Sequence, residues 1–251
     1  MDLFSLAGKR ALITGSTRGI GRAIAEAMIA SGARVIISSE SEEDTQRVAS
    51  DLGQAGITAD VTDDQALAAL VDRAIAELGG LDILVCNAGI TGRPGPFAQI
   101  DMTDFDRVMA LNLRSQVVLS NLALPHIADA GGGSVVLIAS ISALRGNGAI
   151  NAYALSKAGV VQLARNLAVE WGPRNVRVNA IAPGFIATEL SAPLMMNHDF
   201  MQRRMQMTPL RRPGEVEEIG GVAAFLASPA GAFMTGQTLV VDGGTVITDG
   251  S

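Results

Sequence analysis

The chain has 251 residues, of which 48% are hydrophobic, 18% are charged and only 4% are aromatic, and its formal net charge is -6. This negative balance argues against nucleic acid as a partner, because binding to phosphates needs a basic face. A single cysteine excludes an intrachain disulfide, and together with two histidines far apart in sequence it argues against a dedicated transition-metal site.

No charged-then-apolar signal segment opens the sequence. An uninterrupted apolar run of about 18 residues, the length that a membrane-spanning helix needs, does not occur either. The sequence therefore predicts a cytoplasmic protein that makes no contact with a membrane.

Short β-branched runs alternate along the chain with longer stretches in which apolar residues recur at helical spacing. The runs predicted as strands are residues 10–14, 34–39, 57–59, 81–86, 134–139, 176–181 and 238–241. The stretches predicted as helices are residues 19–31, 41–52, 63–78 with Thr62 as a cap, 102–128 in two pieces, 151–171 and 215–226.

The predicted strands are apolar enough to be buried on both faces, which is typical of a parallel sheet covered by helices on both sides. The sequence therefore predicts a single α/β domain over residues 1–251, a Rossmann-type doubly wound sheet of about seven strands. Residues 184–213 fall outside the regular alternation, and long irregular segments within a compact domain are commonly functional.

Tyr153 is the only tyrosine of the chain, and Lys157 follows it within a predicted helix. Residues four apart share one face of a helix, so the phenol and the ammonium point the same way. A nearby positive charge lowers the pKa of a phenol, which makes it a proton donor and acceptor near neutral pH. The pair alone does not exclude the alternative, a packed tyrosine beside a solvated lysine.

Three glycines lie between the first predicted strand and the first predicted helix, in the stretch TGSTRGIG at residues 14–21. Glycine lets the backbone turn tightly and lets a pyrophosphate come close. The helix N-terminus that follows supplies amide donors and a favourable dipole for an anion. This placement predicts a dinucleotide-binding loop.

The pattern TGxxxGxG at residues 14–21 with YxxxK at residues 153–157 resembles the short-chain dehydrogenase/reductase family, and in particular its 3-oxoacyl-carrier-protein reductase-like members. The stretch CNAG at residues 86–89 resembles the family's NNAG motif. Its Cys86 departs from the usual asparagine, and we expect it to be a small buried filler. Asn112, Ser140, Pro183, Gly184 and Thr188 extend the resemblance, which runs from about residue 8 to residue 244.

The resemblance implies a role for each of four residues. Tyr153 would protonate or deprotonate the substrate oxygen, while Lys157 would lower the phenol pKa and hold the nicotinamide ribose. Ser140 would hydrogen-bond the substrate oxygen, and Asn112 would hold a water that links Lys157 to solvent. Ser142 is the alternative candidate for the serine, and a buried structural amide or a helix kink is the alternative for Asn112.

The resemblance also implies a nicotinamide cofactor. Asn87 would stabilise the central loop of the sheet by bonding across strands, and the alternative for Asp60 is a turn or capping residue. The expected cofactor-binding residues are Gly15, Thr17, Arg18, Gly19, Ile20, Gly21, Ser39, Glu40, Asp60, Val61, Asn87, Ala88, Gly89, Tyr153, Lys157, Pro183, Gly184, Ile186 and Thr188.

The choice between NAD(H) and NADP(H) depends on the end of the second strand. Ser39 stands where NAD users of the family place an Asp, and Glu40 stands where NADP users often place an Arg. The Glu40 carboxylate would repel a 2′-phosphate, whereas Arg18 could pair with that phosphate or with Glu40. On balance the sequence favours NAD(H) over NADP(H).

The resemblance implies a substrate lid at about residues 184–213, which contains five methionines and would favour an apolar carbonyl or alcohol. Packing of this methionine face on the core is the alternative. The expected pocket comprises Ser142, Leu144, Ile150, Phe185, Ile90, Thr91 and residues 190–207. Four arginines could bind a carboxylate or phosphate, or could be solvated surface charges: Arg93, Arg145, Arg203 and Arg204.

The resemblance thus implies an NAD(P)-dependent oxidoreductase that interconverts a secondary alcohol and a ketone by hydride transfer at nicotinamide C4, and a homotetramer. One alternative is a cofactor-sensing or scaffold protein without catalysis, because a fold does not fix a function. A second is reduction of an enoyl double bond. Enoyl reductases of the broader group usually space the Tyr–Lys pair by six residues, so YxxxK favours a carbonyl substrate.

Overall fold

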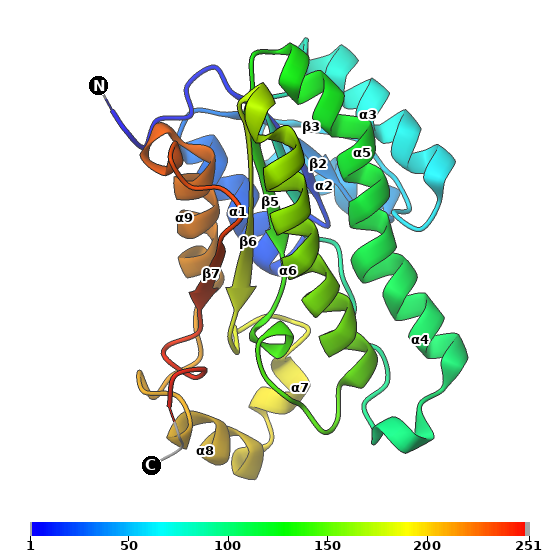
Figure 1. The fold of residues 1–251 in the computed structure, drawn as a ribbon, viewed down its shortest axis with the longest axis vertical. Coiled ribbons are helices and arrows are strands. Elements are labelled where there is room, and N and C mark those ends of the chain that lie inside the picture. Colours follow the sequence, from blue (N-terminus) through cyan, green and yellow to red (C-terminus); the bar gives the residue numbers. More distant parts are fainter. Residues whose placement is uncertain (1, 249–251) are drawn as a thin grey trace.

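The computed structural model describes residues 2–248, and within them seven parallel strands form one sheet in the order β3-β2-β1-β4-β5-β6-β7 (Figure 1). The chain runs outward to one edge from β1, returns, and runs outward to the other edge from β4. The strands are β1 Arg10–Thr14, β2 Arg34–Ser38, β3 Ala55–Gly56, β4 Ile83–Cys86, β5 Gly133–Ile138, β6 Val176–Pro183 and β7 Thr238–Val241.

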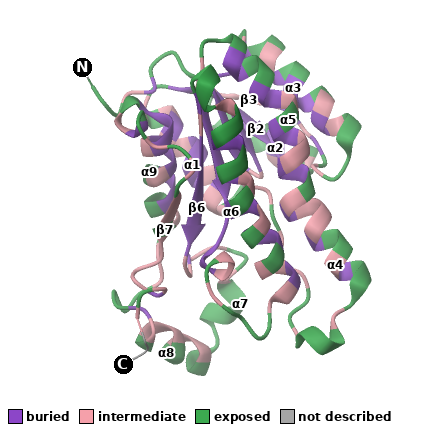
Figure 2. Cartoon of the chain, viewed as in Figure 1, coloured by how far each residue is buried: buried purple, intermediate pink, exposed green. Residues whose placement is uncertain are grey.

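Helices cover both faces of the sheet, and a hydrophobic core lies under each layer (Figures 1 and 2). One core includes residues of α3, α5 and α6, and the other includes residues of α1, α2 and α9. The predicted doubly wound α/β fold is confirmed. The helices are α1 Gly19–Ala30, α2 Glu42–Asp51, α3 Asp64–Leu78, α4 Met102–Met109, α5 Ser115–Asp129, α6 Asn151–Trp171, α7 Ala192–Met195, α8 His198–Gln206 and α9 Val216–Ala227.

Local sequence explains where these elements begin and end. β5 reads GSVVLI, and five of its six residues are buried, as a central strand covered on both faces requires. The side chain of Asp63 caps α3 by accepting from the amides of Gln65 and Ala66. Gly79 ends α3 in a left-handed conformation at φ 75°, which glycine adopts without strain.

Two predicted details are wrong. The third strand pairs at Ala55–Gly56 rather than at residues 57–59, although the amide of Ile57 still donates to the Ile37 carbonyl at 2.9 Å. In the observed register, Ala55 and Gly56 lie opposite Ile36 and Ile37 of β2. This pairing overrides the preference of the β-branched Ile57 for a strand. The cap of α3 is Asp63, not Thr62, because the Thr62 hydroxyl donates to the Asp60 carboxylate at 2.7 Å.

The predicted helical stretch 102–128 is interrupted, as expected, and a π-helical turn over Ala110–Arg114 joins its two pieces, α4 and α5. Residues 184–213 are not fully irregular, because they contain the short helices α7 and α8. In Figure 1 these two helices lie below the carboxyl ends of β6 and β7. Within residues 2–248, every helix is too short or too polar to cross a membrane.

Candidate active site

The candidate residues gather at the carboxyl ends of β1, β4, β5 and β6, which are neighbours in the sheet. In open parallel sheets, ligands bind at this edge, where the strand order reverses. Here the reversal lies between β1 and β4. The loops that follow these four strands carry the glycine stretch, Asn87, Ser140 and Gly184 in turn.

The glycine loop after β1 is held close to the loop after β4. Asn87 Nδ2 donates to the carbonyl oxygens of Thr14 at 3.0 Å and Gly15 at 2.9 Å, which confirms the expected bonding across strands. Gly15 has a φ of 63°, and a Cβ at Gly21 would overlap the Gly15 carbonyl oxygen and the Asn87 side chain. Side chains at these positions would therefore push the glycine loop away from the loop after β4.

Two hydroxyl residues of this loop were missed in the sequence. Thr14 Oγ1 accepts from the amide of Asn87 at 3.2 Å. Ser16 is fully buried, donates to the Ile13 carbonyl at 2.8 Å and accepts from the Ser38 amide at 2.9 Å, which ties the loop to the end of β2. The signal was the pair of hydroxyl residues on either side of Gly15, which offer local partners for backbone groups.

A pocket of about 280 Å³ lies beside the glycine loop, toward α2 and the segment after β6. Arg47 of α2 pairs with Asp44 at 2.6 Å across its wall. Thr188 also lies against this loop, since a Cβ at Gly19 would contact its methyl at 3.6 Å. The pocket is lined by Thr17, Arg18, Gly19, Arg22, Asp44, Arg47 and Glu189.

The end of β2 differs from the expectation in one residue. Ser39 is buried, and its hydroxyl is engaged by Thr45 Oγ1 at 2.9 Å and by the Ser41 carbonyl at 3.2 Å, so it points into the start of α2. Glu40 is exposed. Within residues 2–248 no ion pair joins Arg18 to Glu40.

Asp60 forms a turn, which is the alternative role expected for it. Its Oδ1 accepts from the amide of Thr62 at 2.8 Å and from the Thr62 hydroxyl. Val61 packs partly buried against the core under α3. These contacts explain the two residues structurally, without a ligand.

Lys157 is buried in α6, with 3% of its surface exposed, and Nζ donates to the Ile138 carbonyl at 2.7 Å. Nζ also lies 5.7 Å from the centroid of the Tyr153 ring. Within residues 2–248 no ion pair involves Lys157, so its charge lacks an acidic partner there. Burial lowers the pKa of this ammonium to about 8.

The pKa of Tyr153 differs in direction from the sequence expectation. Burial raises the pKa of the phenol above its ordinary value, while a hydrogen bond with the Ser140 side chain lowers it. The expected lowering by Lys157 is not found, because Nζ is turned toward the Ile138 carbonyl. The phenol is therefore protonated at neutral pH and equipped to donate.

Ser140 lies at the carboxyl end of β5 with 7% of its surface exposed. Its Oγ accepts from the amide of Ser142 at 3.1 Å, so the hydroxyl hydrogen remains available for another acceptor. The hydrogen bond that lowers the Tyr153 pKa places Ser140, rather than Ser142, at the phenol. Ser142 lies two residues farther on, in the turn that opens the segment leading to α6.

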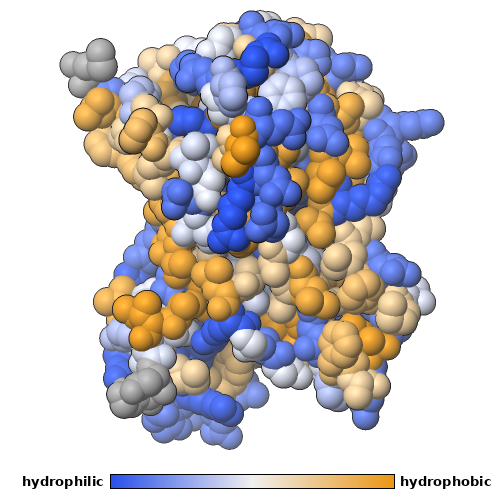
Figure 3. Space-filling model, viewed as in Figure 1, coloured by the Kyte–Doolittle hydropathy of each residue, from blue (hydrophilic) through white to orange (hydrophobic). Residues whose placement is uncertain are grey.

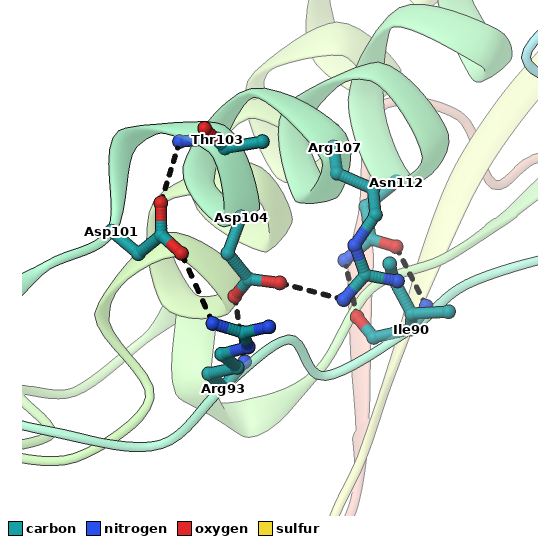
Figure 4. Close-up of polar contacts among 7 residues, drawn as sticks. All are labelled: Ile90, Arg93, Asp101, Thr103, Asp104, Arg107 and Asn112. Carbon is teal, nitrogen blue, oxygen red and sulfur yellow. Dashed lines mark hydrogen bonds and ion pairs between the residues drawn. The ribbon is translucent and has the colours of Figure 1, made fainter.

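Asn112 lies fully buried in the π-helical turn (Figure 4). Its Oδ1 accepts from the Ile90 amide at 2.8 Å, and its Nδ2 donates to the Ile90 carbonyl at 2.8 Å and to Ser156 Oγ at 3.1 Å. Ser156 in turn donates to the Tyr153 carbonyl at 2.8 Å. These bonds hold the Asn112 side chain in place, as a buried structural amide would be held, and Ser156 is a further residue that the sequence did not reveal.

The loop after β4 is anchored to the start of α4 (Figure 4). Asp104 accepts from the Arg93 amide at 2.6 Å and pairs with Arg107 at 2.6 Å. The Arg93 side chain pairs with Asp101 at 3.1 Å, so this arginine is engaged and is not free to bind a ligand. Together with Asn112, these contacts fix the position of Ile90 beside the site.

Cys86 is buried at the end of β4, as expected for a small filler. Burial raises the pKa of its thiol to about 12, so it stays protonated and unreactive at neutral pH. Within residues 2–248 no cluster of metal-ligating side chains is present.

Comparison with known proteins identifies relatives along nearly the whole chain. A family model described as Enoyl-(Acyl carrier protein) reductase matches residues 15–246. The 7alpha-hydroxysteroid dehydrogenase of Escherichia coli (strain K12) is 41% identical over 250 residues, which cover 98% of this chain and 97% of that protein. A short-chain type dehydrogenase/reductase from Mycobacterium marinum has a structure with a TM-score of 0.92 and 37% identity, covering 98% of this chain and 99% of that one.

The chain belongs to the short-chain dehydrogenase/reductase family. A structure of 7 alpha-hydroxysteroid dehydrogenase complexed with NADH and 7-oxo glycochenodeoxycholic acid is also similar, with a TM-score of 0.91, 40% identity and coverage of 97% of this chain and 96% of that one. As a short-chain dehydrogenase/reductase, the chain is an alcohol/ketone oxidoreductase that uses NAD(H) or NADP(H).

The glycine loop of this short-chain dehydrogenase/reductase fits a dinucleotide. Without side chains at Gly15 and Gly21, the loop keeps its close approach to Asn87 and Ala88. The N-terminus of α1 has no side-chain cap, so its first amides are available to a phosphate. Gly184 is equally constrained, since a Cβ there would lie 2.6 Å from the Asp242 Cα.

The residues expected in the substrate pocket of this short-chain dehydrogenase/reductase lie on two segments. Ser142, Leu144 and Ile150 belong to the stretch that joins β5 to α6, and Leu144 is 38% exposed. Phe185 follows β6, and its ring packs edge-on against Phe200 of α8 with centroids 5.6 Å apart. The helix α8 is thereby brought over a residue expected in the pocket.

The buried Lys157 gives a pH-dependent stability that can be measured. Its pKa falls from 10.5 to about 8 on folding, so over this pH range the unfolded chain binds more protons and the free energy of unfolding rises with pH. The stability of wild type relative to Lys157→Met should therefore rise across the window by on the order of 3 kcal/mol. Urea denaturation at a series of pH values checks this, and a difference that stays constant would contradict it.

Proposed function

We propose that Tyr153 is the general acid/base in the interconversion of a secondary alcohol and a ketone. The supporting observation is the convergence of a protonated, partly buried phenol, a buried ammonium without an acidic partner and the Ser140 hydroxyl at one end of the sheet. General acid–base catalysis needs such a group within hydrogen-bond reach of the substrate oxygen.

In the proposed reduction, Tyr153 donates its phenolic proton to the carbonyl oxygen, and in the oxidation it takes the proton back. The nicotinamide, when bound, supplies or accepts the hydride at C4. Ser140 donates a hydrogen bond to the same substrate oxygen, because its own oxygen is engaged by the Ser142 amide. Lys157, whose Nζ lies 5.7 Å from the centroid of the Tyr153 ring, would hold the nicotinamide ribose.

Asn112 would complete a proton relay by holding a water beside Lys157. The Oδ1 of Asn112 keeps one lone pair beyond its bond from Ile90. Asn112 Oδ1 and Lys157 Nζ each lie 3.4 Å from the position that a Cβ on Gly89 would take, so the two atoms flank the same glycine. This neighbourhood supports the relay.

The proposed cofactor is NAD(H) rather than NADP(H), and the proposal rests on Glu40. Glu40 is exposed and follows the end of β2, and a carboxylate there would repel a 2′-phosphate. The NADH of the 7alpha-hydroxysteroid dehydrogenase complex is in keeping with this choice. The remaining predicted contacts of the dinucleotide keep their proposed roles, including Thr17, Ile20 and Ala88.

Replacement of Glu40 by Arg tests this assignment. The Glu40→Arg variant should raise the NADPH to NADH ratio of kcat/KM about tenfold or more, because a hydrogen bond to a charged group contributes about 1.5–3 kcal/mol. Glu42→Arg on the exposed start of α2 is the matched control and should leave the ratio unchanged. An unchanged ratio in Glu40→Arg would remove Glu40 from the cofactor site.

The proposed substrate is a small carbonyl or alcohol compound with an apolar body, covered by residues 184–213 as a lid. Exposed apolar side chains support this, among them Leu190, Met196 and Leu210 at 65%, 88% and 62% exposure. Figure 3 shows orange apolar residues beside blue polar ones over the lower half of the molecule, where Figure 1 places α7 and α8.

A cytoplasmic homotetramer is also part of the proposal. Leu155 and Val169 of α6 are 48% and 81% exposed, and such apolar side chains on one helix are suited to contact with a second copy. Light scattering that gives the mass of a single chain would contradict the tetramer.

Reduction of an enoyl double bond is the second candidate, and the description of the matching family model favours it. The three residues between Tyr153 and Lys157, and the hydroxysteroid relatives, favour the carbonyl. A panel of ketones, alcohols and enoyl thioesters, followed through the absorbance of reduced nicotinamide, separates the candidates. Cofactor binding without turnover of any of them would favour the sensor.

A further inference from the structure

Arg204 of α8 reaches the substrate side of the site. Its guanidinium carbon lies 5.7 Å from the centroid of the Phe185 ring, and Phe185 lies two residues beyond the buried end of β6. The same ring packs against Phe200 one turn earlier in α8. Arg204 therefore lies over a residue expected in the substrate pocket, on the inner side of the proposed lid.

The Arg204 side chain is partly buried and lacks a partner. Its Nε is shielded from solvent and makes no hydrogen bond, and within residues 2–248 no ion pair involves this guanidinium. The charge of Asp242 raises the pKa of Arg204, but Asp242 forms no ion pair with this guanidinium. Its two carboxylate oxygens accept instead from the amides of Gly244 at 2.8 Å and Val246 at 2.7 Å. Burial of an unpaired charge costs free energy, so a partner of opposite charge is missing here.

A second arginine increases this excess of positive charge. Arg145, in the stretch that joins β5 to α6, lies close enough to Arg204 for its charge to lower the pKa of Arg204, in addition to the larger effect of burial. Arg145 is also partly buried, and in the described part of the chain its side chain makes no ion pair. Like charges that face one pocket repel each other unless an anion lies between them.

The other two candidate arginines lack these properties. Arg93 is 78% exposed and pairs with Asp101. Arg203 is exposed on the outer face of α8, one position before Arg204. The arrangement therefore singles out Arg204, which lies beside Phe185, together with Arg145 near it.

We propose that Arg204, assisted by Arg145, binds a carboxylate of the substrate, so that the substrate is an amphiphilic keto acid or hydroxy acid. Its apolar body would lie against Phe185 and Leu144, and its carboxylate would pair with the guanidinium fork of Arg204. The inference rests on the proposed function, because it assigns the carboxylate end of the same substrate whose carbonyl or hydroxyl oxygen exchanges a proton with Tyr153.

The test compares matched substrates on matched variants. Levulinate, a cyclohexanone carboxylate and benzoylpropionate, each with its neutral methyl ester, are assayed with wild type, Arg204→Met and the control Arg203→Met. Arg204→Met should lower kcat/KM for the acids about ten- to hundredfold, mainly through KM, and leave the esters unchanged. Arg203→Met should behave as wild type with both.

Thermal unfolding separates binding from a structural role. Because Arg204 is unpaired, its replacement by Met should leave Tm unchanged or raise it by about 2–4 °C. A structural arginine would instead lower Tm when it is removed, which would contradict the proposal. Titration calorimetry of the same acids gives a readout that does not depend on turnover.

The outcomes distinguish the two levels of the account. Suppose that the esters show turnover that depends on Tyr153, that the acids are not preferred and that Arg204→Met has no effect. This result would overturn the carboxylate site and leave the proposed function standing. If no substrate shows turnover that depends on Tyr153, the proposed function is overturned. Calorimetry alone would then test the carboxylate site. Acids that do not bind, or that bind Arg204→Met as tightly, would overturn the carboxylate site.

Discussion

The Tyr153→Phe variant should lose turnover by about 10²–10⁴-fold, the range that general acid–base catalysis contributes. Phenylalanine keeps the ring beside Lys157 and removes only the hydroxyl that exchanges a proton with the substrate oxygen. No other residue can replace it as a phenol, because Tyr153 is the only tyrosine in the chain. Steady-state assays of ketone reduction and alcohol oxidation, in parallel, measure the loss.

The control for this variant is cofactor affinity. The glycine loop does not contain the phenol, so the dissociation constant of NADH, measured by its fluorescence, should stay close to the wild-type value. A Tyr153→Phe enzyme that keeps turnover within a factor of about ten would exclude Tyr153 as the proton donor. A variant that no longer binds NADH would instead mean that the Tyr153 hydroxyl takes part in holding the cofactor.

Gly21→Ala should abolish tight cofactor binding and destabilise the fold by about 1–3 kcal/mol, the usual range for overpacking. The added methyl would lie 2.8 Å from the Gly15 carbonyl carbon and would overlap the attached oxygen and the Asn87 amide. Relief requires the glycine loop to move away from the loop after β4. That movement would break the hydrogen bonds of Asn87 to Thr14 and Gly15.

A helical glycine with free space provides the control. At Gly221 of α9, no neighbouring atom lies within 4 Å of the position that an added methyl would take, so Gly221→Ala should be neutral or stabilise by up to about 1 kcal/mol. Urea denaturation and NADH fluorescence are measured on both variants. If Gly21→Ala binds NADH as wild type does, the close approach of the two loops is not needed for the cofactor.

The layer arrangement could be predicted because its signals are local and repeated. Strands such as β5 are continuous apolar runs, helices such as α3 carry a regular apolar stripe, and glycines mark the loop after β1. The sheet edge was less predictable. The pairing of β3 at Ala55–Gly56 depends on the register of β2, which no pattern within residues 55–59 reveals.

The site was predictable as a set of residues but not as a set of contacts. The spacing of Tyr153 and Lys157 indicates a shared helix face, yet it cannot show that Nζ turns to the Ile138 carbonyl or that burial raises the phenol pKa. Ser39 occupies a typical cofactor position, but the nearby Thr45 engages its hydroxyl. Such partners come from neighbouring elements, so they depend on packing rather than on spacing.

The measurement that tests the central claim most directly is the transfer of a label from the cofactor to the product. NADH deuterated at either face of C4 is incubated with the enzyme and a ketone, and the alcohol is examined by mass spectrometry. The account predicts one deuterium on the carbinol carbon from one of the two labelled forms, and none from the other. An alcohol without deuterium from either form, or no alcohol from an enzyme that binds NADH, would contradict it.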